Sequence, residues 1–138
     1  MAAMLPWRPT VFPYKIVGGR WSPMISAGLW LQGRWRPIEF YVDSGAAYTI
    51  VRAKVAEDVG FDYRKGRKVF VQVGDGVLIP VFLHDLPVQI GGRRFTGVIG
   101  FSAKLGVPFN LLGRLGVFEH FRICFREKRR VVSFQGEI

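Results

Sequence analysis

The chain has 138 residues, 49% of them hydrophobic and 22% charged, which is typical of one ordinary globular domain. Its single cysteine, Cys124, excludes an internal disulfide and lies in an apolar segment, so we expect a buried thiol and a reducing compartment. Pro6, Arg8, Pro9 and Pro13 interrupt the N-terminal stretch, which excludes the continuous apolar run of a signal peptide or a membrane span. The sequence therefore predicts a cytoplasmic protein with no membrane partner.

The formal net charge of +10 raises the question of an acidic partner. Basic residues gather in three clusters between apolar, strand-like runs, at residues 64–68, 93–94 and 126–130. Two interpretations stay open: turns that project into water, or a surface that binds a polyanion. No recognised nucleic-acid motif accompanies the charge, so nucleic acid is a partner that the charge allows and no motif supports.

In chain order, residues 1–14 are predicted to form an N-terminal arm and residues 15–138 one domain of short strands. Four pairs of apolar or alternating segments, each joined by turn residues, predict β-hairpins. Their strands are 29–31 with 38–42, 69–73 with 77–82, 88–90 with 95–99, and 121–125 with 131–134.

Two further segments have the pattern of short helices. Residues 52–59 are followed by Gly60, a suitable C-terminal cap, and residues 114–120 form the second segment. The chain is therefore predicted to be mostly β, as in a small sandwich or barrel, with one or two short helices.

A carboxylate stands at the far end of the first predicted hairpin, in the stretch FYVDSGAAYTIV of residues 40–51. A buried, unpaired carboxylate is costly, so Asp43 needs a partner, a proton or a chemical task. The small residues Ser44, Gly45 and Ala46 let backbone N–H groups approach and stabilise an anion there. Two interpretations are open at this point: an Asx turn at a strand end, or a reactive carboxylate.

Three elements in order resemble the retropepsin-like family, the single-domain, retroviral-type aspartic proteases. The DSGA turn at residues 43–46 is similar to the family's active-site turn. Residues 73–77 lie where the family carries its flap hairpin, and NLLGR at residues 110–114 resembles its apolar-apolar-Gly segment, which precedes a C-terminal helix. The resemblance spans roughly residues 28–135 and implies a mostly β fold, a closed acid-protease β-barrel.

The resemblance also implies a mechanism. Aspartic proteolysis uses two carboxylates that share one proton, one activating water and the other polarising the scissile carbonyl. This chain has one such turn, so the resemblance implies a homodimer in which each copy contributes Asp43. In that dimer Gly45 would give backbone access to the dyad, and the Ser44 hydroxyl would make a hydrogen bond across the two copies.

The same resemblance assigns the remaining site residues. The flap over an extended peptide substrate would be formed by Gly74, Asp75 and Gly76. The second element beside the catalytic turn would be Leu111, Leu112 and Gly113. Pockets for apolar side chains would be shaped by Ile79, with Ala46 and Leu112, and the bulky Tyr48 would either line or obstruct one.

Two functions from different classes follow. The first is a homodimeric aspartic endopeptidase acting on peptide or protein substrates. The alternative is a non-catalytic retropepsin-like dimerisation or binding module whose basic surface takes a partner such as nucleic acid. Neither a metal nor a cofactor is predicted, because the pairs His84-Asp85 and Glu119-His120 lack the spacing of a zinc site.

Overall fold

The structure is a computed structural model that describes residues 8–137. Most elements in this range are strands: β1 (Thr10–Pro13), β2 (Lys15–Val17), β3 (Arg20–Ser22), β4 (Met24–Leu31), β5 (Arg34–Val42), β6 (Thr49–Arg52), β7 (Arg67–Gln72), β8 (Leu78–Ile90), β9 (Arg93–Ser102), β10 (Asn110–Leu112), β11 (Phe121–Arg126) and β12 (Val131–Gly136). The helix α1 spans Ala53–Asp58, and 3₁₀ turns span Tyr63–Lys65, Phe118–His120 and Glu127–Arg129.

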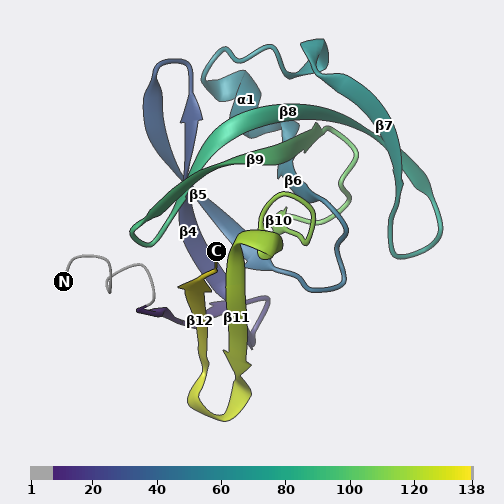
Figure 1. Ribbon diagram of the computed structural model, residues 1–138. Coiled ribbons are helices and arrows are strands. Elements are labelled where there is room, and N and C mark those ends of the chain that lie inside the picture. Colours follow the sequence, from purple (N-terminus) through teal and green to yellow (C-terminus); the bar gives the residue numbers. More distant parts are fainter. Residues whose placement is uncertain (1–7, 138) are drawn as a thin grey trace.

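The larger sheet has seven strands in the order β4-β5-β10-β6-β9-β8-β7. β10 runs parallel to β5 and antiparallel to β6, so it lies between the strand before Asp43 and the strand after it. β4 also pairs with β8 at Gly28–Gln89 and Leu29–Val88, which folds the sheet back on itself around buried Phe40 and Phe101. Figure 1 shows β8 and β9 arching across the top of the molecule above β5 and β6.

All four predicted hairpins are confirmed, with longer strands than the sequence indicated. The two middle hairpins share β8, which runs unbroken for 13 residues. The β4–β5 turn uses Gln32 and Gly33 at φ of 51° and 79°, and a turn with two positive φ values matches the twist of the flanking strands.

One predicted helix is confirmed and the other is wrong. α1 lies within the predicted range 52–59, and Gly60 follows it at a φ of 72°. Residues 114–120 form turns and one 3₁₀ turn instead of a helix, because Gly116 adopts a φ of 79° and packs against the Val98 backbone. Within residues 8–137, no helix is long and apolar enough to cross a membrane.

The thiol of Cys124 is exposed, which corrects the expectation that it is buried. β11 lies at an edge of a second, three-stranded sheet with the order β1-β12-β11. Because side chains alternate along a strand, Phe121 and Ile123 pack on the core and Cys124 points to the other face. An apolar run on an edge strand therefore does not imply that each of its residues is buried.

Part of the predicted arm belongs to this second sheet. Residues 10–13 form β1, which pairs antiparallel with β12, and the Phe12 ring stands edge-on to Phe134 at a centroid distance of 5.7 Å. Trp7, another aromatic residue of the arm, lies outside the described residues. The strand β1 is therefore packed onto the C-terminal hairpin β11–β12.

Tyr14 fastens the chain after β1 to the turn of the β11–β12 hairpin. Its buried side chain donates a hydrogen bond to Glu127 Oε1 at 2.6 Å. Burial, and after it the hydrogen bond and charge of Glu127, raise the pKa of Tyr14 above its ordinary value near 10. Because the unfolded chain then loses this proton first as pH rises, the stabilisation is complete below about pH 10 and is lost above it.

We expect Tyr14→Phe to lower the free energy of unfolding by about 1 kcal/mol at neutral pH, because the hydrogen bond is lost. The difference between wild type and Tyr14→Phe should shrink as pH rises above about 10. Urea unfolding of both proteins across this range measures the difference directly. A difference that stays constant to the highest pH would show that the Tyr14 hydroxyl proton is not what stabilises this contact.

Candidate active site

Asp43 follows the last residue of β5 and begins the loop that leads to β6. Its backbone N–H donates to the Leu112 carbonyl at 3.0 Å, next to the parallel pairing of β5 with β10. The Gly45 N–H donates to Asp43 Oδ1 at 2.9 Å, and the Ala46 N–H donates to the Asp43 carbonyl at 3.1 Å. Backbone groups therefore hold both the main chain and the carboxylate of Asp43.

The Asp43 side chain fits both interpretations of the sequence, an Asx turn and a carboxylate that is available for chemistry. Oδ1 makes the Asx-type contact with Gly45, whereas Oδ2 accepts no hydrogen bond from residues 8–137. A Cβ on Gly45 would stand 3.2 Å from Oδ1, so glycine gives the backbone its close approach. The half-buried carboxylate is therefore oriented and still has one oxygen available for a ligand or a second acid.

The second predicted element crosses the loop after Asp43. Three backbone N–H groups at the end of this element and just after it donate to residues 46–49: Gly113 to Thr49 Oγ1 at 2.9 Å, Arg114 to the Ala46 carbonyl at 3.0 Å, and Leu115 to the Ala47 carbonyl at 2.8 Å. The structure thus brings together the two segments that the sequence identified 67 residues apart, at Asp43 and Asn110.

Gly113 stands where the two segments meet. A Cβ at this position would overlap the Tyr48 carbonyl and would lie 2.9 Å from the Ala46 carbonyl oxygen. Both neighbours are backbone groups, and the Ala46 oxygen is also held by the Arg114 N–H. The crossing therefore requires glycine because there is no room for a Cβ atom, and not because the residue adopts an unusual φ.

Thr49 is fully buried, and its hydroxyl is the acceptor for the Gly113 N–H. We expect Thr49→Val to lower the free energy of unfolding by about 2 kcal/mol, because it leaves a buried N–H without a partner. Thr49→Ser keeps the acceptor and should lose clearly less. Thermal unfolding of the three proteins checks this order. A larger loss in Thr49→Ser than in Thr49→Val would show that the methyl group, and not the hydroxyl acceptor, is what stabilises this position.

Sequence reasoning missed the role of Asn110. Its side chain is buried, donates to the Glu39 carbonyl at 2.9 Å and accepts from the Arg52 N–H at 2.8 Å. These two bonds join β10 to the chain before Asp43 and to the end of β6. The sequence could have indicated this role, because Asn110 directly precedes two apolar residues of the predicted second element and a buried amide needs hydrogen-bond partners.

A cavity of about 800 Å³ lies beside Asp43. Of the predicted site residues, it is lined by Asp43, Gly45, Ala46, Gly74, Asp75 and Leu111. Ser44 and Gly76 are exposed and do not line it, and Leu112 and Gly113 are buried. Ile79 does not line the cavity either, since it is 4% exposed and packs with Ile50 and Leu105 in an apolar cluster.

The β7–β8 hairpin supplies one wall of this cavity. Its turn is closed by a hydrogen bond from the Val73 N–H to the Val77 carbonyl at 2.9 Å, and Asp75 Oδ1 accepts from the Val77 N–H at 3.0 Å. Figure 1 shows this turn projecting at the right of the molecule, away from β4 and β5. Asp75 and Gly74 therefore stand on a hairpin end that faces the Asp43 loop across the cavity.

Aromatic residues that the sequence did not single out line the same cavity. Tyr41 and Phe109 stack with ring centroids 5.0 Å apart and an interplanar angle of 27°. Tyr48, which the sequence analysis did name, lines the cavity as well. The sequence could have indicated Tyr41, because it stands two residues before Asp43 and alternate residues of a strand share a face.

The charge of this cavity is opposite to that of the chain. Among its lining residues in the described range, the charged side chains are Asp43 and Asp75, and neither lysine nor arginine is present. The whole chain nevertheless carries 20 lysine and arginine residues. The cavity is therefore an acidic, mostly apolar cleft in a basic protein.

Comparisons with known proteins identify the family and the fold of the chain. Residues 27–114 match the aspartyl protease family, which is more than half of the chain. The crystal structure of a retropepsin-like aspartic protease from Rickettsia conorii superposes with a TM-score of 0.65 at 18% identity, covering 91% of this chain and 98% of that one. The protease of EIAV in complex with the inhibitor HBY-793 superposes with a TM-score of 0.53 at 16% identity, covering 72% of this chain and 88% of that one. A comparison with curated protein sequences found no match. The chain belongs to the aspartyl protease family, and its fold is retropepsin-like.

Proposed function

We propose that the protein is a homodimeric aspartic endopeptidase, in which Asp43 of each copy forms the catalytic dyad. The observation that carries this proposal is the Asp43 carboxylate, which the Gly45 N–H holds at the edge of a cavity of about 800 Å³ with one oxygen uncommitted. The family match supports the reaction class, and the retropepsin-like fold supports the arrangement of turn, hairpin and second element.

A second copy is part of the proposal because one chain supplies one such carboxylate. Asp75 also lines the cavity, but it belongs to the opposite hairpin and its Oδ1 is used by the Val77 N–H. A two-fold axis beside the Asp43 loop brings Asp43 and its equivalent together, as an isologous contact does. Exposed Ser44 then faces the partner and is placed to hydrogen-bond across the axis.

The chemistry follows from two carboxylates that share one proton. The ionised carboxylate takes a proton from a water molecule, whose oxygen attacks the scissile carbonyl carbon. The protonated carboxylate donates its hydrogen bond to the carbonyl oxygen as negative charge develops there. Collapse of the tetrahedral intermediate transfers a proton to the leaving amine and breaks the peptide bond, which regenerates the dyad.

The cavity walls indicate the kind of peptide that fits. Backbone groups of the hairpin turn at Gly74 and Asp75 are placed to pair with an extended peptide. Tyr41, Tyr48 and Phe109 offer aromatic faces to its side chains. We therefore expect cleavage between apolar residues, in an extended segment that enters under the hairpin.

Incubation with a diverse peptide mixture, read by mass spectrometry from about pH 4 to about pH 9, tests this proposal. The expected result is cleavage that is faster at mildly acidic pH and blocked by a statyl-type inhibitor. A rate that rises steadily to about pH 9 would contradict a shared proton. A folded dimer that cleaves nothing but binds DNA or RNA with steep salt dependence would support the alternative binding module.

A further inference from the structure

A second cavity, of about 590 Å³, lies between β1, the β8–β9 turn and the strands β11 and β12. It shares no lining residue with the cavity at Asp43. In Figure 1, β12 and the β8–β9 turn lie on the left of the molecule, whereas the β7–β8 turn that lines the Asp43 cavity lies on the right. The second cavity is therefore a separate place in the fold, which the proposed proteolysis does not use.

The floor of this cavity is apolar. Ile90, Phe121 and Phe134 line it and are otherwise buried in the core, and the two phenylalanine rings stand edge-on with centroids 5.3 Å apart. Water over such a floor is displaced favourably by an apolar group. The volume is within the range of pockets that hold small organic molecules.

Arg93, the first residue of β9, lines this cavity and forms no ion pair with an acidic side chain of residues 8–137. Its guanidinium carbon lies 6.0 Å from the centre of the Phe121 ring, and Nη2 donates to the Glu137 carbonyl at 2.9 Å. Its Nε is buried and has no hydrogen-bond partner among residues 8–137. A buried donor without a partner is unfavourable, and an anion that accepts from it relieves that cost.

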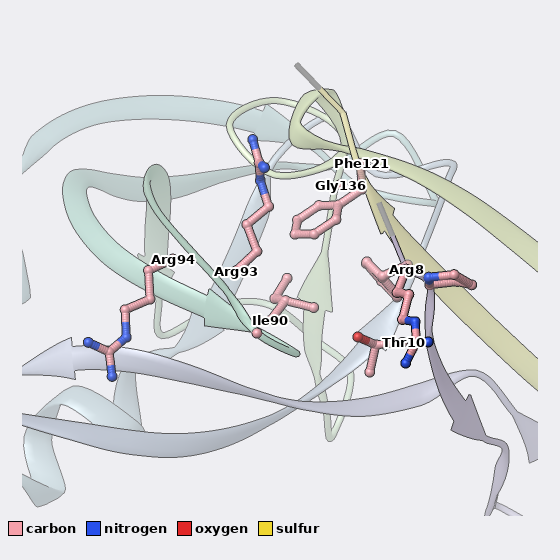
Figure 2. A pocket seen from close by; sticks show the side chains of 10 residues that line it. Arg8, Thr10, Ile90, Arg93, Arg94, Phe121 and Gly136 are labelled. Carbon is pink, nitrogen blue, oxygen red and sulfur yellow. The ribbon is translucent and has the colours of Figure 1, made fainter. Parts of the chain in front are cut away.

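The other two arginines of the cavity differ in orientation. Figure 2 shows Arg8 beside Thr10 on the wall opposite Arg93, while Arg94 points away from the other labelled residues. Arg94 is engaged elsewhere, since its Nε donates to Gln89 at 2.9 Å and its guanidinium lies 4.9 Å from the Trp35 ring centre. No acidic side chain of the described range lines the cavity. Arg8 and Arg93 thus present positive charge from two walls, over an apolar floor.

We propose that this cavity binds a small organic carboxylate with an apolar body. The carboxylate accepts from Arg93 Nε and pairs with Arg8, and guanidinium groups bind carboxylates strongly through such hydrogen bonds. The apolar body lies on Ile90, Phe121 and Phe134. Because β1, the β8–β9 turn and β12 all line the cavity, the bound molecule also holds the N-terminal strand against the rest of the chain.

The test uses calorimetry with 4-phenylbutyrate and its neutral analogue 4-phenylbutanamide, on the full chain. We expect the carboxylate to bind at least about tenfold more tightly than the amide, since the amide lacks the charge-assisted hydrogen bonds. Binding should also raise the melting temperature in proportion to occupancy. A statyl-type inhibitor at the Asp43 cavity should not compete, which separates this proposal from the proposed proteolysis.

Arg93→Gln and Arg94→Gln form a matched pair, because the residues are neighbours and each substitution removes one positive charge. Arg93→Gln is expected to weaken 4-phenylbutyrate at least about tenfold, and Arg94→Gln less than about twofold. Circular dichroism confirms that each variant is folded, and Arg8→Gln, on the other wall, provides a second weakened variant if Arg93→Gln unfolds. Equal weakening by Arg93→Gln and Arg94→Gln, or no binding by wild type at millimolar 4-phenylbutyrate, would overturn the proposal.

Discussion

Asp43→Asn is expected to lower the rate of peptide cleavage by at least about a thousandfold, with no loss of folded dimer. An amide cannot take a proton from water, and proton transfer by a positioned side chain contributes factors of this size. The substitution keeps the shape of the side chain and its Oδ1, so the contact with the Gly45 N–H persists. Mass spectrometry of peptide products measures the rate, and light scattering measures the dimer.

Asp85→Asn is the control for this prediction. Asp85 is exposed on β8 and does not line the cavity at Asp43, and its substitution makes the same change in charge. We expect its cleavage rate to equal that of wild type within experimental error. Retained cleavage in Asp43→Asn would remove Asp43 from the mechanism and, with it, the proposed dyad.

Gly113→Ala is expected to lower the free energy of unfolding by about 3 kcal/mol, the upper end of the cost of forcing extra atoms into a packed site. For a chain of this size that corresponds to a fall in melting temperature of about 10 °C. The new Cβ would meet the Tyr48 and Ala46 carbonyls, which are backbone groups and cannot rotate away. Because these carbonyls belong to the Asp43 loop, cleavage should fall together with stability.

Gly92→Ala is the matched control, since a Cβ at Gly92 meets no atom within 4 Å and its φ is not in the left-handed region. It should change the melting temperature by less than about 2 °C. Thermal unfolding by circular dichroism compares the two variants with wild type. A Gly113→Ala protein as stable as Gly92→Ala would show that the crossing of loop and second element can relax.

Much of this fold could be predicted because its signals are local. Alternating apolar residues and the turns at Gly33, Asp75 and Gly92 fix three of the four hairpins through contacts between neighbouring residues. The failed helix at residues 114–120 has a non-local cause. Gly116 takes a positive φ where it packs on Val98 of β9, and nothing within the segment announces that contact.

The part of the candidate site that could be predicted also rests on local signals. Asp43 and Gly113 stand in short motifs that the sequence displays. Thr49, Asn110 and the stacked pair Tyr41 and Phe109 act through contacts between segments far apart in the chain. Ile79 shows the reverse error: its position next to the flap suggested a pocket residue, but the alternation of β8 turns it into the core.

The most direct test of the account is to mix subunits. Wild-type protein is incubated with an equal amount of Asp43→Asn until native mass spectrometry shows mixed dimers, and cleavage is then compared with the same amount of wild type alone. Random exchange leaves about half of the wild-type subunits paired with each other, so a dyad shared between two copies predicts a fall to about half of the wild-type rate. Mixing with Asp85→Asn instead should cause no such fall. An unchanged rate in the presence of mixed Asp43→Asn dimers would show that one Asp43 suffices, and would contradict a dyad shared between two copies.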